Sequence, residues 1–366
     1  MEVKTVTEIN SSERRQKRRK IALVVDRPEW ALDHIADQVI KNLSDEFDFR
    51  RIYAIDIDNF VDVLIVAADC DIVHMFWRGL ISCFDDVYCQ DRIHNLGITR
   101  EEFVEKYVKG KIISTEVYDH LLLTGQDYEI TKKIFAHRES ICTNYAVSSM
   151  KLLKIYNGLP DLRLRPQAIC QDGVDLTLFQ PDNLCRFDTI GTRKVYFGWA
   201  GNSKWATGDL KGINTIIRPA IEELKSEGYP VELVTSDRLN RLIPHDEMPN
   251  FSHSLDCYIC ASTGEGTPNP VLEAMACGVP VISTDVGIVP EVFGAEQKKY
   301  IMSDRSVESL KSKIVQLLNE EDGFRRLSNE NLRSIRNWDW KIKVEKIRKY
   351  FHDCLQADGV EQQRVQ

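Results

Sequence analysis

Two glutamates in the C-terminal half, Glu265 and Glu273, have a spacing that suits binding of a hydroxyl-rich ligand. Asn269 and Pro270 lie between them, and this order predicts a loop, an N-cap at Asn269 and a helix that begins at Pro270. The free backbone N–H groups at such a helix start attract an anion. Glu273 comes one residue too late for a capping box with Asn269, so neither carboxylate has an evident local structural role.

A ligand that combines vicinal hydroxyls with a diphosphate would use all of these groups. Carboxylates accept paired hydrogen bonds from diols, and the helix start faces phosphate. Nucleotide sugars have this chemistry. The competing interpretation makes both glutamates surface charges on an ordinary strand–loop–helix unit, and the spacing alone does not reject it.

The segment around these glutamates resembles a known protein family. Residues 265–284 resemble the glutamate–seven-residues–glutamate signature of glycosyltransferase family 4, a retaining family with the GT-B fold. A weaker similarity extends over residues 173–291, and residues 173–181 resemble the end of that family's N-terminal domain. The order of segments along the whole chain is consistent with the same family.

The resemblance implies roles for the residues of the signature. Glu265 would contact the hydroxyls of the donor sugar, and Glu273 would contact the ribose of the nucleotide. The donor-binding loop between them would include Thr267, Pro268 and Asn269.

A second segment resembles the family's phosphate-binding strand end. It covers residues 198–204, so Gly201 and Asn202 would approach the donor. A basic pair usually neutralises the diphosphate there. The common arginine is absent, and Lys204 and Lys211 are the candidates. Two lysines and a helix start can stabilise a departing diphosphate without a metal.

We expect no metal ion and no cofactor beyond the nucleoside-diphosphate sugar donor. A metal-dependent transferase would carry an Asp-x-Asp ligand pair. Residues 56–58 have that form, but they follow a predicted strand in the N-terminal half, far from the signature. We interpret them as a turn.

The N-terminal half contributes one further candidate through the resemblance. Residues 114–120 resemble the strand end where the family places a histidine near the donor sugar, which makes His120 the candidate; a structural histidine is the alternative. His74 is interpreted as an acceptor-side or structural residue. Family members often have two glycines after the first strand, but residues 26–30 read Asp-Arg-Pro-Glu-Trp. The acceptor side is therefore expected to be unusual.

Two more segments complete the expected site. Residues 236–244, with Ile243 among them, are expected to approach the nucleotide base. Ile288 replaces a frequent second glycine of the family, whereas Glu291 is retained as a structural or sugar-side contact.

Short apolar runs alternate with helical spacing along the chain and must position these groups. Predicted strands cover residues 20–26, 51–55, 71–75, 111–115, 140–143, 165–169, 194–199, 231–235, 255–261 and 279–283. Predicted helices cover residues 30–43, 60–68, 146–156, 211–227 and 270–277, with further helices to the end. Continuously apolar strands between helices indicate parallel sheets covered on both faces. Such sheets bind ligands outside the carboxyl ends of their strands.

The predicted fold class is α/β, with two doubly wound Rossmann-like domains facing across a cleft. A basic arm at residues 1–19 precedes an acceptor-side domain at residues 20–185 and a nucleotide-sugar-binding domain at residues 186–335. Residues 336–366 form a tail and a helix that, as in GT-B proteins, would cross back to the first domain. Trp338 and Trp340 are expected to pack there.

Composition restricts the partners. The 366 residues are 43% hydrophobic and 28% charged, which is typical of soluble globular proteins. A net charge of -8 argues against nucleic-acid binding, which needs a basic surface. The basic run at residues 14–20 allows two interpretations, a solvated arm or a contact with an anionic membrane surface.

The expected location is cytoplasmic, with peripheral contact at the inner face of the membrane as the alternative. No apolar stretch reaches the length of a membrane span or forms the apolar centre of a signal peptide. The ten cysteines include one Cys-x-x-Cys pair, Cys257 and Cys260. These two are expected on opposite faces of a buried strand.

These observations predict a retaining glycosyltransferase that moves a hexose-type sugar to a hydroxyl of a sugar, glycan or lipid-linked acceptor, in polysaccharide or glycoconjugate biosynthesis. The alternatives are another GT-B enzyme, such as a sugar-nucleotide epimerase or a phosphorylase, and a non-catalytic sugar-nucleotide-binding partner of a polysaccharide assembly complex. A dehydrogenase is disfavoured, because no Gly-x-Gly-x-x-Gly follows the first strand.

Overall fold

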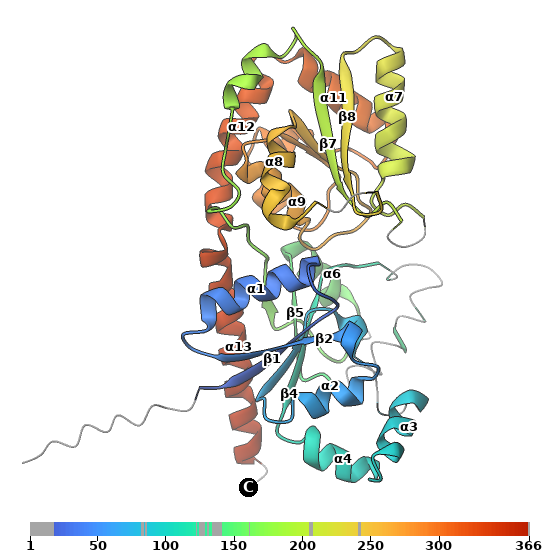
Figure 1. The fold of residues 1–366 in the computed structure, drawn as a ribbon, viewed down its shortest axis with the longest axis vertical. Helices are drawn as coiled ribbons and strands as arrows, with labels where there is room; N and C mark the ends of the chain where they lie inside the picture. The colour runs from blue at the N-terminus through green and yellow to red at the C-terminus, as the bar shows by residue number, and fades with distance from the viewer. Residues whose placement is uncertain are drawn as a thin grey trace, which may run out of the picture.

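The computed structural model describes residues 18–364 apart from 82–83, 85, 122, 124–128, 130–131, 134–140, 161, 205–207 and 241–242. The described residues contain two parallel sheets, one in each half of the chain, and the two halves lie one above the other (Figure 1). Most of the predicted basic arm, residues 1–17, lies outside the described residues.

The N-terminal sheet has six strands in the order β2-β1-β3-β4-β5-β6. They are β1 (Lys20–Val25), β2 (Asp48–Tyr53), β3 (Ile72–Met75), β4 (Ile112–Val117), β5 (Asn144–Val147) and β6 (Ala168–Ile169). All neighbours are parallel. Because β2 and β3 flank β1 on opposite sides, the loops that follow β1 and β3 lead to opposite sides at the carboxyl edge, the position where open sheets of this type bind ligands.

Helices cover both faces of this sheet. They are α1 (Ala31–Leu43), α2 (Phe60–Val66), α3 (Val87–Asn95), α4 (Arg100–Tyr107) and α6 (Met150–Gly158). The apolar side of α1 packs with β1 in one cluster, and α2 packs with the opposite face of β1 in another. Alternate residues of β1 therefore enter different cores, which explains why this strand is apolar throughout.

Several predicted elements of this half are displaced. The strand predicted at residues 140–143 is β5, four residues later, and the helix predicted at residues 146–156 begins at Met150. An apolar run here fits either element, and Ser149 decides the helix start because its side chain accepts from the Leu152 N–H. The strand predicted at residues 51–55 is β2, and it ends where a 3-10 turn, Ala54–Asp56, begins.

The helices α3 and α4 were not predicted, although α4 carries a readable start. Thr99 and Glu102 form a capping box, in which each side chain accepts from the other residue's backbone N–H. This pattern of a threonine followed three residues later by a glutamate would have located α4 from the sequence.

The C-terminal sheet has four parallel strands in the order β10-β9-β7-β8. The strands are β7 (Val195–Gly201), β8 (Val231–Asp237), β9 (Cys257–Cys260) and β10 (Val281–Ser283). The helices are α7 (Arg218–Ser226), α8 (Met248–His253), α9 (Asn269–Ala276), α10 (Val289–Val292), α11 (Val307–Asn319) and α12 (Gly323–Ser334). Cys257 and Cys260 of β9 are buried in different clusters, so their predicted placement on opposite faces is confirmed.

The last helix, α13 (Trp340–Arg364), crosses back to the N-terminal half. Figure 1 shows α12 and α13 following one another along one side of the molecule. Backbone hydrogen bonds from Val174 N–H to Trp338 O and from Trp340 N–H to Val174 O, 2.8 and 3.2 Å, fix the crossing point. The apolar side of α13, including Tyr350 and Phe351, is buried with β1 and α1, as predicted.

Candidate functional site

A lysine and a glutamate meet at the carboxyl edge of the C-terminal sheet. Lys211 follows β7 and Glu265 follows β9, and these strands are neighbours. β8 and β9 flank β7 on opposite sides, so this edge is a topological switch point where open α/β sheets bind ligands. Lys211 Nζ lies 2.5 Å from Glu265 Oε1. Neither side chain is more than about a quarter exposed, at 27% and 14%.

The backbone next to Lys211 explains this approach. Gly212 has φ of 73°, and a Cβ there would lie 2.4 Å from the carbonyl oxygen of Ala261. Only glycine permits both this conformation and this contact. Arg305 holds the two loops together, since its guanidinium donates to Ala261 O and Asp209 O. No motif in the sequence marks Arg305 for this role.

The Lys211–Glu265 pair also sets the charge of the site. Burial lowers the pKa of Lys211, but the negative charge and hydrogen bond of Glu265 outweigh it, so the pKa lies above its ordinary value. Lys211 therefore keeps its positive charge at neutral pH. Lys211 is 54 positions from Glu265 in the chain, so this contact is not a local one and does not contradict the absence of a local structural role for Glu265.

The helix that follows Glu265 begins one residue earlier than predicted. Pro268 is the N-cap of α9, Asn269 is its first residue, and no side chain caps it. Asn269 is therefore not the cap: its backbone is already helical, and its buried Oδ1 has no hydrogen-bond partner among the described residues. The first-turn N–H of Val271 donates instead to Pro268 O, at 2.8 Å.

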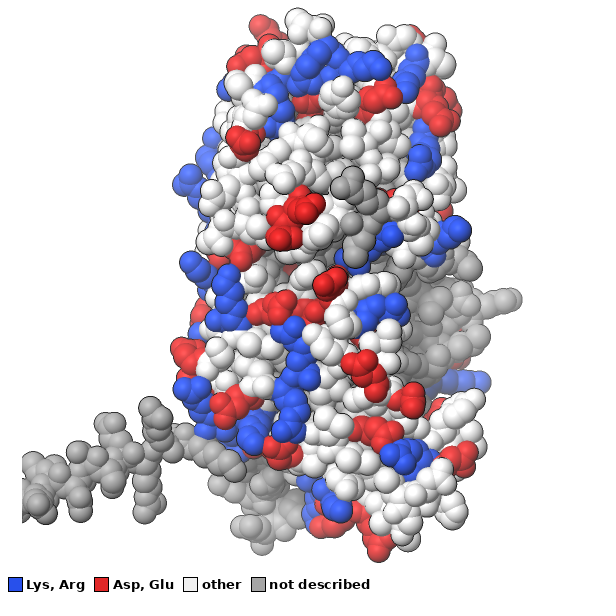
Figure 2. Space-filling view, in the orientation of Figure 1, with Lys and Arg blue, Asp and Glu red and all other residues white. Residues whose placement is uncertain are grey.

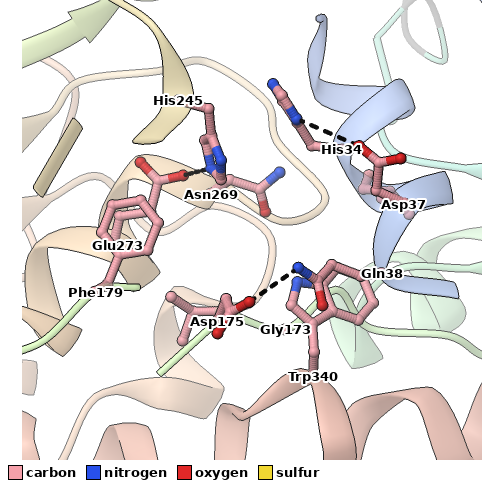
Figure 3. Close-up of a pocket in the computed structure, with 12 residues that line it drawn as sticks. His34, Asp37, Gln38, Gly173, Asp175, Phe179, His245, Asn269, Glu273 and Trp340 are labelled. Carbon is pink, nitrogen blue, oxygen red and sulfur yellow. Dashed lines mark hydrogen bonds and ion pairs between the residues drawn. The ribbon is translucent and has the colours of Figure 1, made fainter. Parts of the chain in front are cut away.

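Glu273, on α9, also has a partner that the sequence did not predict. His245 Nε2 lies 3.3 Å from Glu273 Oε1 (Figure 3). The ring of His245 stacks on His34 of α1, with centroids 4.3 Å apart and planes at 21°. Phe179 contacts the same imidazole edge-on at 5.4 Å. Glu273 is thereby connected through one imidazole to the N-terminal half.

These residues line a cavity of about 120 Å³ between α1, residues 173–179 and α9. Its walls also include Gln38 and Asp175, which are joined by a 3.2 Å hydrogen bond (Figure 3). Ligand pockets for drug-sized molecules start at roughly 300 Å³. A complete nucleotide sugar is larger than this cavity, so its binding requires space outside it or a movement of the walls.

The pKa values of the two stacked histidines are shifted in opposite directions. Burial lowers the pKa of His245, but the hydrogen bond and charge of Glu273, with smaller contributions from Asp175 and Asp246, raise it above the ordinary value. Burial lowers the pKa of His34, and the neighbouring His245 lowers it further. Of the two rings, the arrangement therefore favours a proton on His245 over one on His34.

The loop that carries Glu265, here called the signature loop, contacts the N-terminal half at Gly266. A Cβ on this residue would lie 2.0 Å from Ser148 Oγ and 2.6 Å from Tyr118 O. Gly287, with φ of 47°, packs on the carbonyl of Gly266, and Ile288 N–H donates to that carbonyl at 3.0 Å. Glycine at both positions allows the loop to pass between the two halves.

His120 follows β4 and faces this loop. A Cβ on Gly264 would lie 3.5 Å from His120 Cε1. Burial and the charge of Lys151 lower the pKa of His120, so its ring is neutral near pH 7. Its buried Nδ1 has no partner among the described residues. The imidazole thus lies beside the loop that carries Glu265, on the N-terminal side.

Two buried acids lie behind the signature loop. Glu116 and Asp172 are 2% and 1% exposed. Burial raises the pKa of Asp172 to about 8, and burial together with Asp172 raises that of Glu116 well above its ordinary value. Thr267 is also buried, and among the described residues its hydroxyl has no hydrogen-bond partner.

The remaining predicted donor residues lie around the same edge. Gly201 ends β7 and covers the ring of Trp199, and Asn202 Oδ1 accepts from the Lys204 backbone N–H at 3.0 Å. The Lys204 side chain is exposed, and the structure does not bring it to Glu265. Ile243 packs against the apolar cluster that contains α9.

The loop after β1 has no glycine pair, yet it adopts a backbone conformation that favours glycine. Glu29 has φ of 60°, and its N–H donates to Asp33 Oδ2 at 2.9 Å. The guanidinium groups of Arg27 and Arg238 both contact the ring of Trp30, at 4.3 and 5.4 Å from its centroid. Arg238, which follows β8, was not predicted, and it brings a second contact between the two halves next to the His34–His245 stack.

Two other predicted residues and the predicted turn at residues 56–58 are structural in this arrangement. His74 is buried, lies 2.8 Å from Ser114 Oγ through Nδ1 and contacts the ring of Phe351, so its place is in the core. Glu291 accepts from Met150 N–H at 2.9 Å and from Gln171 Nε2 at 2.7 Å, which joins the two halves. The predicted turn at residues 56–58 begins with Asp56, the last residue of the 3-10 turn after β2.

The surface carries both signs of charge. Figure 2 shows Lys and Arg interspersed with Asp and Glu over both halves on this face, without a continuous basic field. In the part of the chain that the structure describes, no helix combines the length and apolar character that a membrane crossing needs.

The architecture is that of the GT-B fold. The chain superposes on sucrose-phosphate synthase from Thermosynechococcus elongatus with a TM-score of 0.62 and 13% identity, over 93% of this chain and 100% of the other. It also superposes on HepE from Anabaena, in complex with UDP and glucose, with a TM-score of 0.63 and 11% identity, over 91% and 99% of the two chains. Residues 241–334 match the family model of glycosyl transferases group 1.

Curated relatives are similar over a short part of the chain. An O-antigen chain mannosyltransferase B of Escherichia coli is 28% identical over 27% of this chain and 26% of its own length. A lipopolysaccharide core biosynthesis mannosyltransferase, LpsB, of Rhizobium meliloti is 36% identical over 19% and 20%. An N-acetyl-alpha-D-glucosaminyl L-malate synthase of Bacillus anthracis is 29% identical over 33% and 32%. The chain thus matches a third or less of each relative's length.

Proposed function

We infer that the protein is a retaining, metal-independent glycosyltransferase. It transfers a hexose-type sugar from a nucleoside-diphosphate sugar to a hydroxyl of a sugar, glycan or lipid-linked acceptor, in polysaccharide or glycoconjugate biosynthesis. Two of the similar proteins are mannosyltransferases of surface polysaccharides, and HepE forms a complex with UDP and glucose, which supports this choice of substrates.

The observation that carries the proposal is the Lys211–Glu265 pair at the switch point. Glu265 lies eight residues before Glu273, in the loop that leads into the helix of Glu273. A partly buried ammonium can stabilise a departing diphosphate, and the adjacent carboxylate can accept from sugar hydroxyls. Glu273 lies further along, where it can accept from the ribose diol. Together these groups supply the phosphate, sugar and nucleoside contacts that a nucleotide sugar needs.

In the proposed reaction the bond between the anomeric carbon and the diphosphate oxygen breaks, and a bond from the same carbon to the acceptor oxygen forms on the same face. The acceptor proton moves to the departing phosphate oxygen. Lys211, with Lys204 as second candidate, stabilises that oxygen, Glu265 orients the sugar, and neutral His120 lies on the sugar's N-terminal side. Gly201, Asn202, Thr267, Pro268, Asn269 and Ile243 complete the donor site.

Donor binding is the first test. A ligand that binds only the folded state raises the melting temperature. Melting curves with uridine, guanosine, adenosine and cytidine diphosphate sugars should show a rise for one base. Glu273→Ala should abolish that rise, whereas Lys211→Ala should reduce turnover more than binding. If all of Lys204→Ala, Lys211→Ala, Glu265→Ala and Glu273→Ala turn over as the unmodified protein does, the proposal is wrong.

The product separates this function from its alternatives. A free, altered sugar formed without acceptor identifies an epimerase, and donor binding without turnover over a broad acceptor panel identifies a binding partner. The anomeric configuration, measured by NMR with a chelator present, tests retention and metal independence together. Co-sedimentation with anionic vesicles, with and without residues 14–20, tests peripheral membrane contact through the basic segment.

A further inference from the structure

His245 connects the carboxylate of Glu273 to the N-terminal half of the molecule. Its Nε2 lies 3.3 Å from Glu273 Oε1, while His34 of α1 stacks on one side of the ring and Phe179 contacts it edge-on. Two ring contacts hold the imidazole in one orientation. The direction of the Glu273 carboxylate is therefore set by a side chain that α1 itself helps to hold.

The second oxygen of Glu273 is left for a ligand. Its side chain is 12% exposed and lines the cavity between α1 and α9 (Figure 3). Among the described residues, only His245 is bonded to this carboxylate, through Oε1. A ribose diol that approaches Glu273 thus meets Oε2 on a carboxylate whose rotation is already restricted.

We propose that His245 is a positioning residue for Glu273 and that His34 couples this positioning to the approach of the two halves. The inference rests on the proposed function, in which Glu273 binds the nucleotide ribose. His245 acts through Glu273 and does not touch the ligand. When α1 moves away, the His34 ring leaves with it, and His245 loses the stack that holds it against Glu273.

The charges around His245 and His34 favour a single proton on these two rings. Glu273, Asp175 and Asp246 face His245 and raise its pKa against the effect of burial. Around His34, burial, His245 and Arg238 lower the pKa, and Asp37 and Asp33 raise it. Two charged rings in a stack would repel each other, so the contact is strongest with His245 protonated and His34 neutral. The bond to Glu273 weakens as pH rises through the pKa of His245.

Binding of UDP, GDP and ADP to the full chain, measured by calorimetry, tests the positioning. His245→Phe keeps the ring between His34 and Phe179 but removes the donor, and it should weaken binding of the preferred nucleotide about 10-fold, as expected for a lost hydrogen bond to a charged group. His245→Gln keeps an N–H donor and should recover most of that loss. His253→Gln is the matched control, since His253 bonds only to Gln180 O in the described structure.

A double-mutant cycle with Glu273→Ala distinguishes positioning from a direct contact. Glu273→Ala should weaken binding at least as much as His245→Phe, and adding His245→Phe to it should have no further effect. His34→Ala should weaken binding about 3-fold, less than a full hydrogen bond, and this effect should disappear in the His245→Phe background.

The pH profile gives a readout that a purely structural role would not change. Titration of the nucleotide phosphate affects both proteins alike, so it cancels when the dissociation constant of the unmodified protein is divided by that of His245→Gln. That ratio should rise from pH 6 to pH 9 as His245 loses its proton. A flat ratio overturns the role of His245.

The outcomes separate the two proposals. If none of the nucleotides binds, or if Glu273→Ala binds as the unmodified protein does, the proposed function fails and this inference fails with it. If Glu273→Ala weakens binding but His245→Phe does not, or if the two effects add in full, the proposed function stands and the positioning role is overturned. Additive effects of His34→Ala and His245→Phe overturn the coupling to α1.

Discussion

Lys211 Nζ and Glu265 Oε1 lie 2.5 Å apart although the two residues are 54 positions apart in the chain. The contact spans the switch point between β7 and β9, and Gly212 and Arg305 hold the two loops that carry it. A pair in this position combines a phosphate-directed charge with a hydroxyl acceptor. Its two members should therefore differ in what they contribute to the proposed reaction.

Lys211→Ala should lower kcat about 100-fold, the size of effect seen when one group that stabilises developing negative charge is removed. The donor KM should change much less, because the lysine stabilises the leaving group more than the bound donor. Steady-state kinetics with the preferred nucleotide sugar measure both constants. Lys194→Ala is the control, since Lys194 pairs with Glu232 on the exposed start of the sheet. An unchanged kcat for Lys211→Ala contradicts its assigned role.

Gly266→Ala should separate the two halves of the molecule. The added Cβ would lie 2.0 Å from Ser148 Oγ and 2.6 Å from Tyr118 O, and the backbone atom cannot move as freely as a side chain. Overpacking of this kind costs about 1–3 kcal/mol. The variant should melt at a lower temperature and show a larger radius of gyration by small-angle X-ray scattering. Gly158→Ala, which meets no atom within 4 Å, should match the unmodified protein in both measurements.

The sequence predicted the fold better than the contacts of the site. Buried strands such as β1 are apolar throughout, and this pattern identifies a strand of a covered parallel sheet without tertiary information. The spacing of Glu265 and Glu273 was likewise readable. Their partners Lys211 and His245 come from separate loops, and only the folding of both loops onto one sheet edge makes them neighbours.

Other features of the site depend on shape that a sequence pattern does not carry. Asn269 and Pro270 have the residue types of a helix start, but the helix begins one residue earlier and the amide faces the cavity. Arg238 and Trp30 belong to loops of opposite halves, so their contact follows from the placement of α1 against the end of β8. The sequence also did not predict the left-handed backbone of Glu29, because glycine is the residue that favours this conformation.

Asp172 should make the protein less stable as pH rises. Burial raises its pKa to about 8 in the folded state, above the ordinary value of 3.8, so the folded state binds more protons than the unfolded state between these values. The contribution of Asp172 to the free energy of unfolding is complete below its unfolded-state pKa and is lost as pH rises through its folded-state pKa. The free energy of unfolding falls by up to about 1.4 kcal/mol per pH unit over this range.

The comparison of the unmodified protein with Asp172→Asn tests this contribution. Melting temperatures from pH 6 to pH 9 should show Asp172→Asn gaining on the unmodified protein as pH rises. The change should slow above pH 8, where Asp172 is ionised in both states. Asp48→Asn, at an exposed position of β2, should show no such trend. A constant difference between Asp172→Asn and the unmodified protein contradicts the buried, protonated state of Asp172.

Phe351→Ala should destabilise the N-terminal half, although Phe351 lies in the last helix of the chain. Its ring is fully buried and contacts Phe47 and His74, with centroid distances of 6.0 and 5.4 Å. Truncation of a buried phenylalanine costs about 3–5 kcal/mol. Hydrogen exchange should show lost protection in β1 and α1 and unchanged protection in β7. Lys349→Ala, which removes an exposed ion pair with Asp353, should cost less than about 1 kcal/mol. Lost protection confined to β7 and its neighbours would show that α13 does not stabilise the N-terminal half.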